Sequence, residues 1–129
     1  MNCNENRSLD ELRREAAWYA SFFGDARRFT GSLFNVLRST PEKAVRQAAV
    51  AAVYYSSFPL ASGQKIFNPA SWFTSACRHY AEPEVAVPAE VQAWAEMDLS
   101  LEEIRRCIQL GIRLPSEMDR FGETKAGLE

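Results

Sequence analysis

The sequence predicts an all-α protein, a compact bundle of about five to six helices in a single domain. Apolar residues recur every three or four positions along most of the chain, which is the spacing of one face of a helix. Capping residues and prolines stand where these periodic segments begin, and no segment has the pattern of a strand. Apolar residues make up 47% of the 129 residues, which is enough to form one core.

The first periodic segment begins at residues 8–11, where the letters SLDE have the pattern of a capping box. In that motif the Ser8 side chain accepts from the amide of Glu11, and the Glu11 side chain reaches back to the cap. Two apolar stripes follow, one on each side of Gly24: Leu12, Ala16, Tyr19 and Phe23, then Ala26, Phe29, Leu33 and Leu37. We expect two helices here, or one long kinked helix.

The next helix is predicted to have Thr40 as its cap and Pro41 at the first helical position, where a missing amide proton has no consequence. Residues 44–55 are small and apolar on almost every side, so we expect this helix in the middle of the bundle. Residues 57–67 contain a proline, a glycine and no helical period, which predicts a loop.

Residues 68–80, NPASWFTSACRHY, predict a helix that the asparagine caps and the proline begins. Its large apolar residues fall at helical spacing on one side. We therefore expect this helix to bury Trp72, Phe73 and Ala76 and to expose Arg78.

Two shorter helices are predicted in the last third of the chain. The first begins at Pro88 and carries Val91 and Trp94. The second begins with another capping box at residues 100–103 and ends at Gly111, because glycine readily takes the left-handed conformation that closes a helix.

Charge divides the chain unevenly. Residues 26–80 hold seven basic residues against one acidic residue, whereas residues 81–129 hold five against eleven. We expect residues 1–7 to be disordered, residues 8–114 to form the helical domain and residues 115–129 to be a flexible acidic tail. Twelve of the fifteen cations are arginine, which suits phosphate and carboxylate recognition but is also what a GC-rich genome would encode.

Catalytic and metal-binding patterns are missing from the sequence. It has no phosphate-binding glycine loop and no nucleophile elbow. Cys77 and His79 are two residues apart, about 200° around a helix, so they would point to different faces. We therefore expect no catalysis, no metal and no cofactor. Three widely spaced cysteines and the lack of a signal peptide or long apolar run predict reduced thiols in a cytoplasmic protein.

Two short segments resemble known families. Asn68, Pro69, Trp72 and Phe73 match the Asn-Pro-x-x-Trp-Phe segment that follows the winged-helix part in some plasmid and phage replication initiators. LSLEEIRRCIQLG at 99–111 resembles a helix of MerR-type regulators. Together they cover under a quarter of the chain, and neither the winged helix nor the rest of a MerR reader is visible. The first resemblance implies a role in replication, without assigning any residue a catalytic or base-reading part.

The sequence therefore favours a non-catalytic domain that binds nucleic acid, DNA rather than RNA, or that acts as an accessory in a replication or transcription assembly. The predicted contacts are the seven basic residues Arg27, Arg28, Arg38, Lys43, Arg46, Lys65 and Arg78. Tyr54, Tyr55 and Phe67 are the predicted exposed aromatics, because two consecutive tyrosines cannot both face the same side of a helix.

The alternative is a protein-interaction adaptor without nucleic-acid binding. Its acidic C-terminal half would dock a basic partner, and its arginines would be engaged within the chain. Both hypotheses exclude a membrane partner, and both leave open whether the protein is a homo-oligomer.

Overall fold

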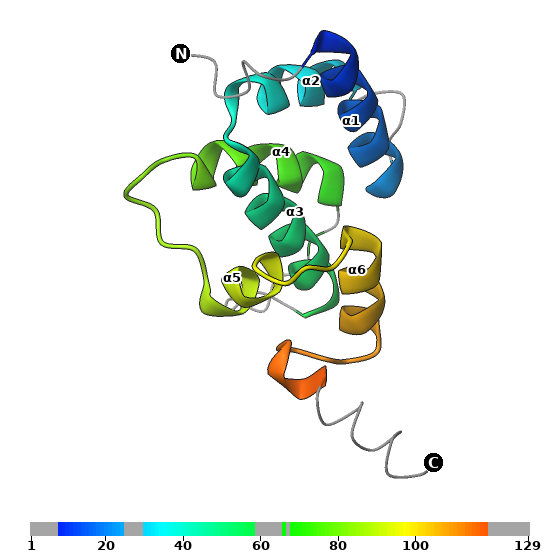
Figure 1. The fold of residues 1–129 in the computed structure, drawn as a ribbon, viewed down its shortest axis with the longest axis vertical. Coiled ribbons are helices and arrows are strands. Elements are labelled where there is room, and N and C mark those ends of the chain that lie inside the picture. Colours follow the sequence, from blue (N-terminus) through cyan, green and yellow to red (C-terminus); the bar gives the residue numbers. More distant parts are fainter. Residues whose placement is uncertain (1–7, 25–29, 59–65, 67, 119–129) are drawn as a thin grey trace.

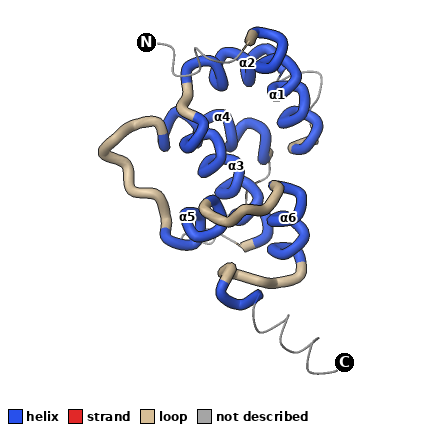
Figure 2. Tube along the Cα trace, in the orientation of Figure 1, coloured by secondary structure: helices blue, strands red, loops and turns tan. Residues whose placement is uncertain are grey.

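The computed structural model describes residues 8–24, 30–58, 66 and 68–118, apart from the side chains of residues 30–32. The described chain is all helical and forms one compact body, which confirms the predicted fold class (Figure 1). The helices are α1 (Leu9–Phe22), α2 (Thr30–Ser39), α3 (Glu42–Ser57), α4 (Pro69–Tyr80), α5 (Ala89–Ala95) and α6 (Leu101–Gln109). A helical turn at 116–118 follows them, and no strand occurs in these ranges (Figure 2).

Helix α3 occupies the middle of the bundle, as its small apolar residues predicted. It packs against α4, α5 and α6, while α1 and α2 pair with each other and α2 also touches α4. Figure 1 shows α1 and α2 at one end, α3 and α4 crossing in the centre, and α5 and α6 at the other end. Every residue of α3 from Ala44 to Tyr55 except Arg46 is buried, because neighbours surround this helix.

The core joins the two ends of the bundle. Its largest fully buried side chains are Trp94 of α5 and Phe73 of α4. Phe73 stacks on Tyr19, with ring centroids 4.9 Å apart, and also meets Phe23 at 5.0 Å. This aromatic contact attaches α1 to α4.

Local capping chemistry fixes several of the helix ends that the sequence predicted. Asn68 accepts a hydrogen bond from the amide of Ser71, 3.1 Å away, and caps α4. The second capping box is complete, because Ser100 and Glu103 bond to each other's backbone amides. Gly111 follows the end of α6. Its φ of +94° is the left-handed conformation that was expected there.

Three boundaries differ from the prediction. Helix α5 begins at Ala89 with Pro88 in the capping position, one residue later than expected. Helix α3 begins at Glu42 with Pro41 in the capping position, one residue later than expected, and Pro41 has no hydroxyl with which to cap the helix. The packed body also continues past Leu114. Residues 116–118 form a helical turn, and Met118 packs against the core, so this part of the predicted tail belongs to the bundle.

The predicted exposure of three aromatic side chains was wrong. Tyr54 and Tyr55 are only 7% and 9% exposed, because α3 has neighbours on all sides. The Tyr54 ring packs on Phe58 and the Tyr55 ring on Trp72. Trp72 was expected to be buried and is only half-buried, whereas Phe73 and Ala76 are buried and Arg78 is exposed, as predicted. Phe67 lies outside the described residues.

In the described part of the chain, no helix has both the length and the apolar character needed to span a bilayer.

Candidate functional site

The seven predicted contact residues fall into three groups. Arg27, Arg28 and Lys65 lie outside the described residues. Arg38, Lys43 and Arg78 are exposed, the first two at the junction between α2 and α3 and the third in the last turn of α4. Arg46 is half-buried and points into the molecule. Whether these cations form one surface stays a prediction.

Arg46 is engaged with backbone of the connection between α5 and α6. Its Nε donates to the carbonyl of Ala95 at 2.6 Å, and its Nη2 donates to those of Met97 and Leu99 at 2.8 and 2.9 Å. Three carbonyls thus converge on one guanidinium, and its charge strengthens each hydrogen bond. The described contacts therefore give Arg46 a role in the fold.

Two arginines outside the predicted set are also held within the chain. Arg105 donates from Nη1 to the carbonyl of Phe22 at 3.1 Å, and its guanidinium lies 4.0 Å from the centroid of that ring. The guanidinium of Arg113 lies 4.8 Å from the centroid of Phe58. Cation–π contacts of this kind hold an arginine side chain against an aromatic ring.

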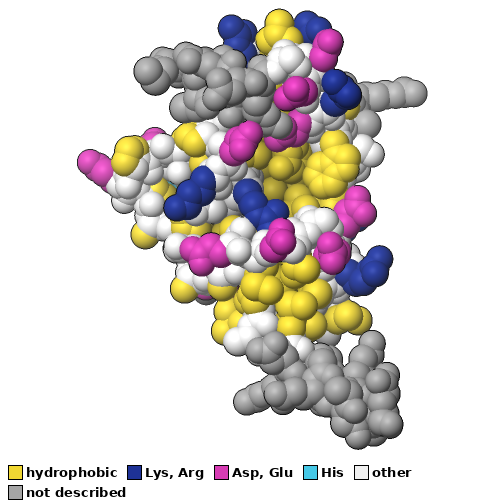
Figure 3. All heavy atoms as spheres, in the orientation of Figure 1, with side chains coloured by type: hydrophobic (Ala, Val, Ile, Leu, Met, Phe, Trp, Pro, Cys, Tyr) yellow, Lys and Arg dark blue, Asp and Glu magenta, His cyan; other side chains and the backbone are white. Residues whose placement is uncertain are grey.

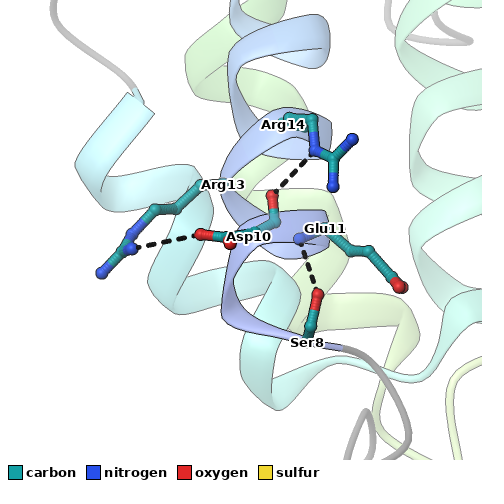
Figure 4. A network of polar contacts seen from close by, with 5 residues as sticks. All are labelled: Ser8, Asp10, Glu11, Arg13 and Arg14. Carbon is teal, nitrogen blue, oxygen red and sulfur yellow. Dashed lines mark hydrogen bonds and ion pairs between the residues drawn. The ribbon is translucent and has the colours of Figure 1, made fainter.

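The first turns of α1 engage two further arginines (Figure 4). Arg13 pairs with the carboxylate of Asp10 at 3.6 Å, and Nε of Arg14 donates to the backbone carbonyl of the same residue at 3.4 Å. Both contacts are exposed, so solvent weakens them and the two charges stay on the surface.

One face of α4 forms a hollow in the surface of about 360 Å³. Trp72, Ser75, Ala76, His79 and Tyr80 line it, and they follow one another at the three- and four-residue spacing of a helix face. We call this hollow the α4 groove. Its two large rings, Trp72 and Tyr80, are half-buried and His79 is exposed, so aromatic surface faces the groove.

Glu90 and Tyr55 lie beside the α4 groove. The hydroxyl of Tyr55 donates to Glu90 at 2.9 Å, and the Tyr55 ring packs on Trp72. Burial, followed by the negative charge of Glu90, raises the pKa values of Tyr54 and Tyr80, and burial and the hydrogen bond raise that of Tyr55. These tyrosines stay protonated near neutral pH, and Tyr55 supports the wall of the groove through its contact with Trp72.

Of the two cysteines that the structure describes, Cys77 does not have the environment of a nucleophile. Cys77 is fully buried, and burial raises the pKa of its thiol to about 12. Cys107 is half-buried, and Cys3 lies outside the described residues. Over the ranges that the structure describes, no three His, Cys, Asp or Glu side chains lie together in a way that could hold a metal ion.

On the face shown in Figure 3, Lys and Arg side chains lie among Asp and Glu side chains. Acidic groups cross the middle of this face near α5 and α6, with apolar side chains below them. The described residues of this face therefore carry mixed charge.

Sequence reasoning missed the α4 groove and the contacts of Arg105. Trp72 stands at the edge of the buried stripe of α4, which was the available signal for its partial exposure. Arg105 lies four residues after Leu101 and so borders the buried stripe of α6, but its aromatic partner is 83 residues away in the chain.

Comparisons of the chain with protein-family models, curated proteins and solved structures found no match.

Proposed function

We propose that this domain binds nucleic acid, by itself or as an accessory within a replication or transcription assembly. The observation that carries the proposal is the half-buried Trp72, which lines the α4 groove with His79 and Tyr80. Aromatic faces of this kind stack on bases, and nearby cations meet phosphates. The resemblance of residues 68–73 to replication initiators supports the same function.

The described cations that would meet phosphate are Arg38, Lys43 and Arg78, whose side chains are exposed. Arg78 lies about 120° around α4 from Trp72, because successive residues turn by about 100°. The two side chains therefore flank the exposed side of this helix, and a nucleic-acid strand that crosses the helix would contact both.

Salt dependence separates phosphate contacts from other binding. We expect the full chain to bind oligonucleotides, and the double variant Arg38→Ala/Lys43→Ala to lower the salt slope of binding by about 2, one for each lost phosphate contact. Arg14→Ala/Arg106→Ala is the matched control, since it removes the same charge from α1 and α6. Fluorescence anisotropy between about 50 and 200 mM salt measures both slopes. An equal change in the two double variants would contradict a specific role for Arg38 and Lys43.

The groove has a test of its own. Trp72→Leu should weaken binding by about fivefold or more at every salt concentration, since loss of one stacked base costs about 1–3 kcal/mol, and should leave the salt slope unchanged. Trp18→Leu is the control, because Trp18 is 41% exposed on α1, outside the α4 groove. Equal affinities for the two variants would remove the groove from the binding surface.

The second candidate function is a protein-interaction adaptor. This hypothesis expects the arginines to make contacts within the chain, and Arg46, Arg105 and Arg113 do so through hydrogen bonds or a cation–π contact. Asp98 and Glu102 are also exposed between α5 and the first turn of α6. Failure to bind any oligonucleotide at about 50 mM salt would favour this candidate. A lysine-rich peptide should then bind the protein and lose affinity for the charge-reversed variant Asp98→Lys/Glu102→Lys.

A further inference from the structure

A second hollow lies where α1, α3, α4 and α6 meet. Its volume is about 140 Å³, and residues from all four helices line it. Phe23 and Val53 give it apolar walls, while Arg105 and Gln109 bring polar groups from α6. An apolar cavity of about 150 Å³ is large enough to hold benzene, so this hollow can take a ligand group of that size. We call it the four-helix cavity.

The guanidinium of Arg105 is held in a fixed position at this cavity. Its Nη1 donates to the carbonyl of Phe22 at 3.1 Å, and its Cζ atom lies 4.0 Å from the centroid of the Phe22 ring. An arginine has five N–H donors, and this is the one hydrogen bond that Arg105 makes to the described residues. Two contacts thus orient the side chain, while most of its donors make no hydrogen bond to the part of the chain that the structure describes.

The polar groups of the cavity favour an anion. Arg105 and the amide of Gln109 supply donors, whereas the proton of Ser56 is already given to the carbonyl of Ala52 at 2.6 Å. Among the described residues no carboxylate pairs with Arg105, so its charge is not neutralised there. A guanidinium fork matches the two oxygens of a carboxylate or a phosphate.

We propose that the four-helix cavity binds the carboxylate or phosphate of a small molecule with an apolar group of about the size of a benzene ring. The oxyanion lies against the donors of Arg105, with Gln109 beside it, and the apolar group contacts Phe23 and Val53. The α4 groove is lined by other residues, so this binding does not depend on the proposed nucleic-acid function.

Titration of the full-length protein with benzoate, followed by NMR, tests this proposal directly. The Nε–H resonance of Arg105, assigned with the Arg105→Lys variant, should shift and saturate. Acetate should bind more weakly, because it lacks the apolar group, and phenylphosphonate should bind at the same site. A resonance that does not move with benzoate or phenylphosphonate at millimolar concentration would overturn the proposal. Because this titration uses the unsubstituted protein, loss of folding cannot explain such a result.

Variants assign the binding to the cavity. Arg105→Gln should lower benzoate affinity by about tenfold or more, the effect of a lost hydrogen bond between charged groups. The control is Arg106→Gln, which removes the same charge from the exposed neighbouring position and should stay within about twofold. Because Arg105→Gln also breaks the contact with Phe22, Gln109→Ala provides a second test and should weaken binding by about twofold to tenfold. Equal affinity in the Arg105→Gln and Arg106→Gln proteins would overturn the assignment.

Oligonucleotide binding and benzoate binding, measured on the same protein, separate the two proposals. Benzoate binding without oligonucleotide binding would leave the cavity intact as a small-molecule site and reject the nucleic-acid function. Oligonucleotide binding without any response of Arg105 to benzoate or phenylphosphonate would reject the cavity proposal alone.

Discussion

At the scale of single residues, Trp94 and Trp72 have different surroundings and should differ in their effect on stability. Trp94 is fully buried and donates from Nε1 to the carbonyl of Arg113 at 2.9 Å. Trp94→Ala should therefore cost about 3–5 kcal/mol of unfolding free energy, as for other buried aromatics. Trp72→Ala should cost roughly 1–2 kcal/mol, because a half-buried ring loses less contact area. Urea denaturation measures both, and a larger cost at Trp72 would contradict this order.

Alkaline pH provides a second test at this scale. Burial raises the pKa of Cys77 from its ordinary value of 9.0 to about 12. At pH values between these two, the unfolded chain loses the proton that the folded chain keeps, so the free energy of unfolding must fall as pH rises. The expected slope from this thiol approaches about 1.4 kcal/mol per pH unit. Urea denaturation between pH 8 and about pH 10.5 measures the slope.

The control for this pH dependence is Cys77→Ala, which removes the thiol. Its overall stability should be lower because a buried group is truncated, but its loss of stability above pH 9 should be shallower. The tyrosines with raised pKa values contribute to the remaining slope in both proteins. Identical slopes in the two proteins would show that Cys77 does not titrate differently on folding.

At the scale of helices and their connections, Arg46 stabilises the segment between α5 and α6. Arg46→Ala should lower the free energy of unfolding by about 2–4 kcal/mol, because it removes three charge-assisted hydrogen bonds to carbonyls. Arg46→Lys should recover only part of this loss, since one ammonium group lacks the fork of the guanidinium. Lys43→Ala, at an exposed position of the same helix, should change stability by less than about 0.5 kcal/mol. Equal effects at Arg46 and Lys43 in thermal unfolding would contradict this role.

The same arginine shows what the sequence can and cannot predict. Helix α3 and its burial follow from local patterns, since the small residues between Ala44 and Tyr55 have a helical spacing and no polar face. The partners of Arg46 are carbonyls about 50 residues away, and no local pattern encodes them. Charge counting therefore placed Arg46 on a basic surface, whereas the packing of α5 against α3 gives it partners inside the molecule.

At the scale of the whole molecule, the capping residues and apolar stripes predict the helices but not the surfaces between them. The α4 groove depends on how far Trp72 is covered, and the four-helix cavity depends on four helices meeting. Periodicity assigns a residue to a side of its own helix and does not say which neighbour covers that side. This is also why Tyr54 and Tyr55 were expected to be exposed and are buried instead.

The C-terminal end of the described chain tests how far the folded body extends. The amide of Arg113 donates to Glu117 at 3.1 Å, and Met118 packs against the core. A chain that ends at Met118 keeps both contacts, while a chain that ends at Pro115 loses both. We expect the shorter chain to melt several degrees lower, because a loss of about 1 kcal/mol shifts the melting temperature of a domain of this size by about 4 °C. Differential scanning calorimetry of the two truncated proteins gives the difference, and equal melting temperatures would show that the packed body ends before residue 116.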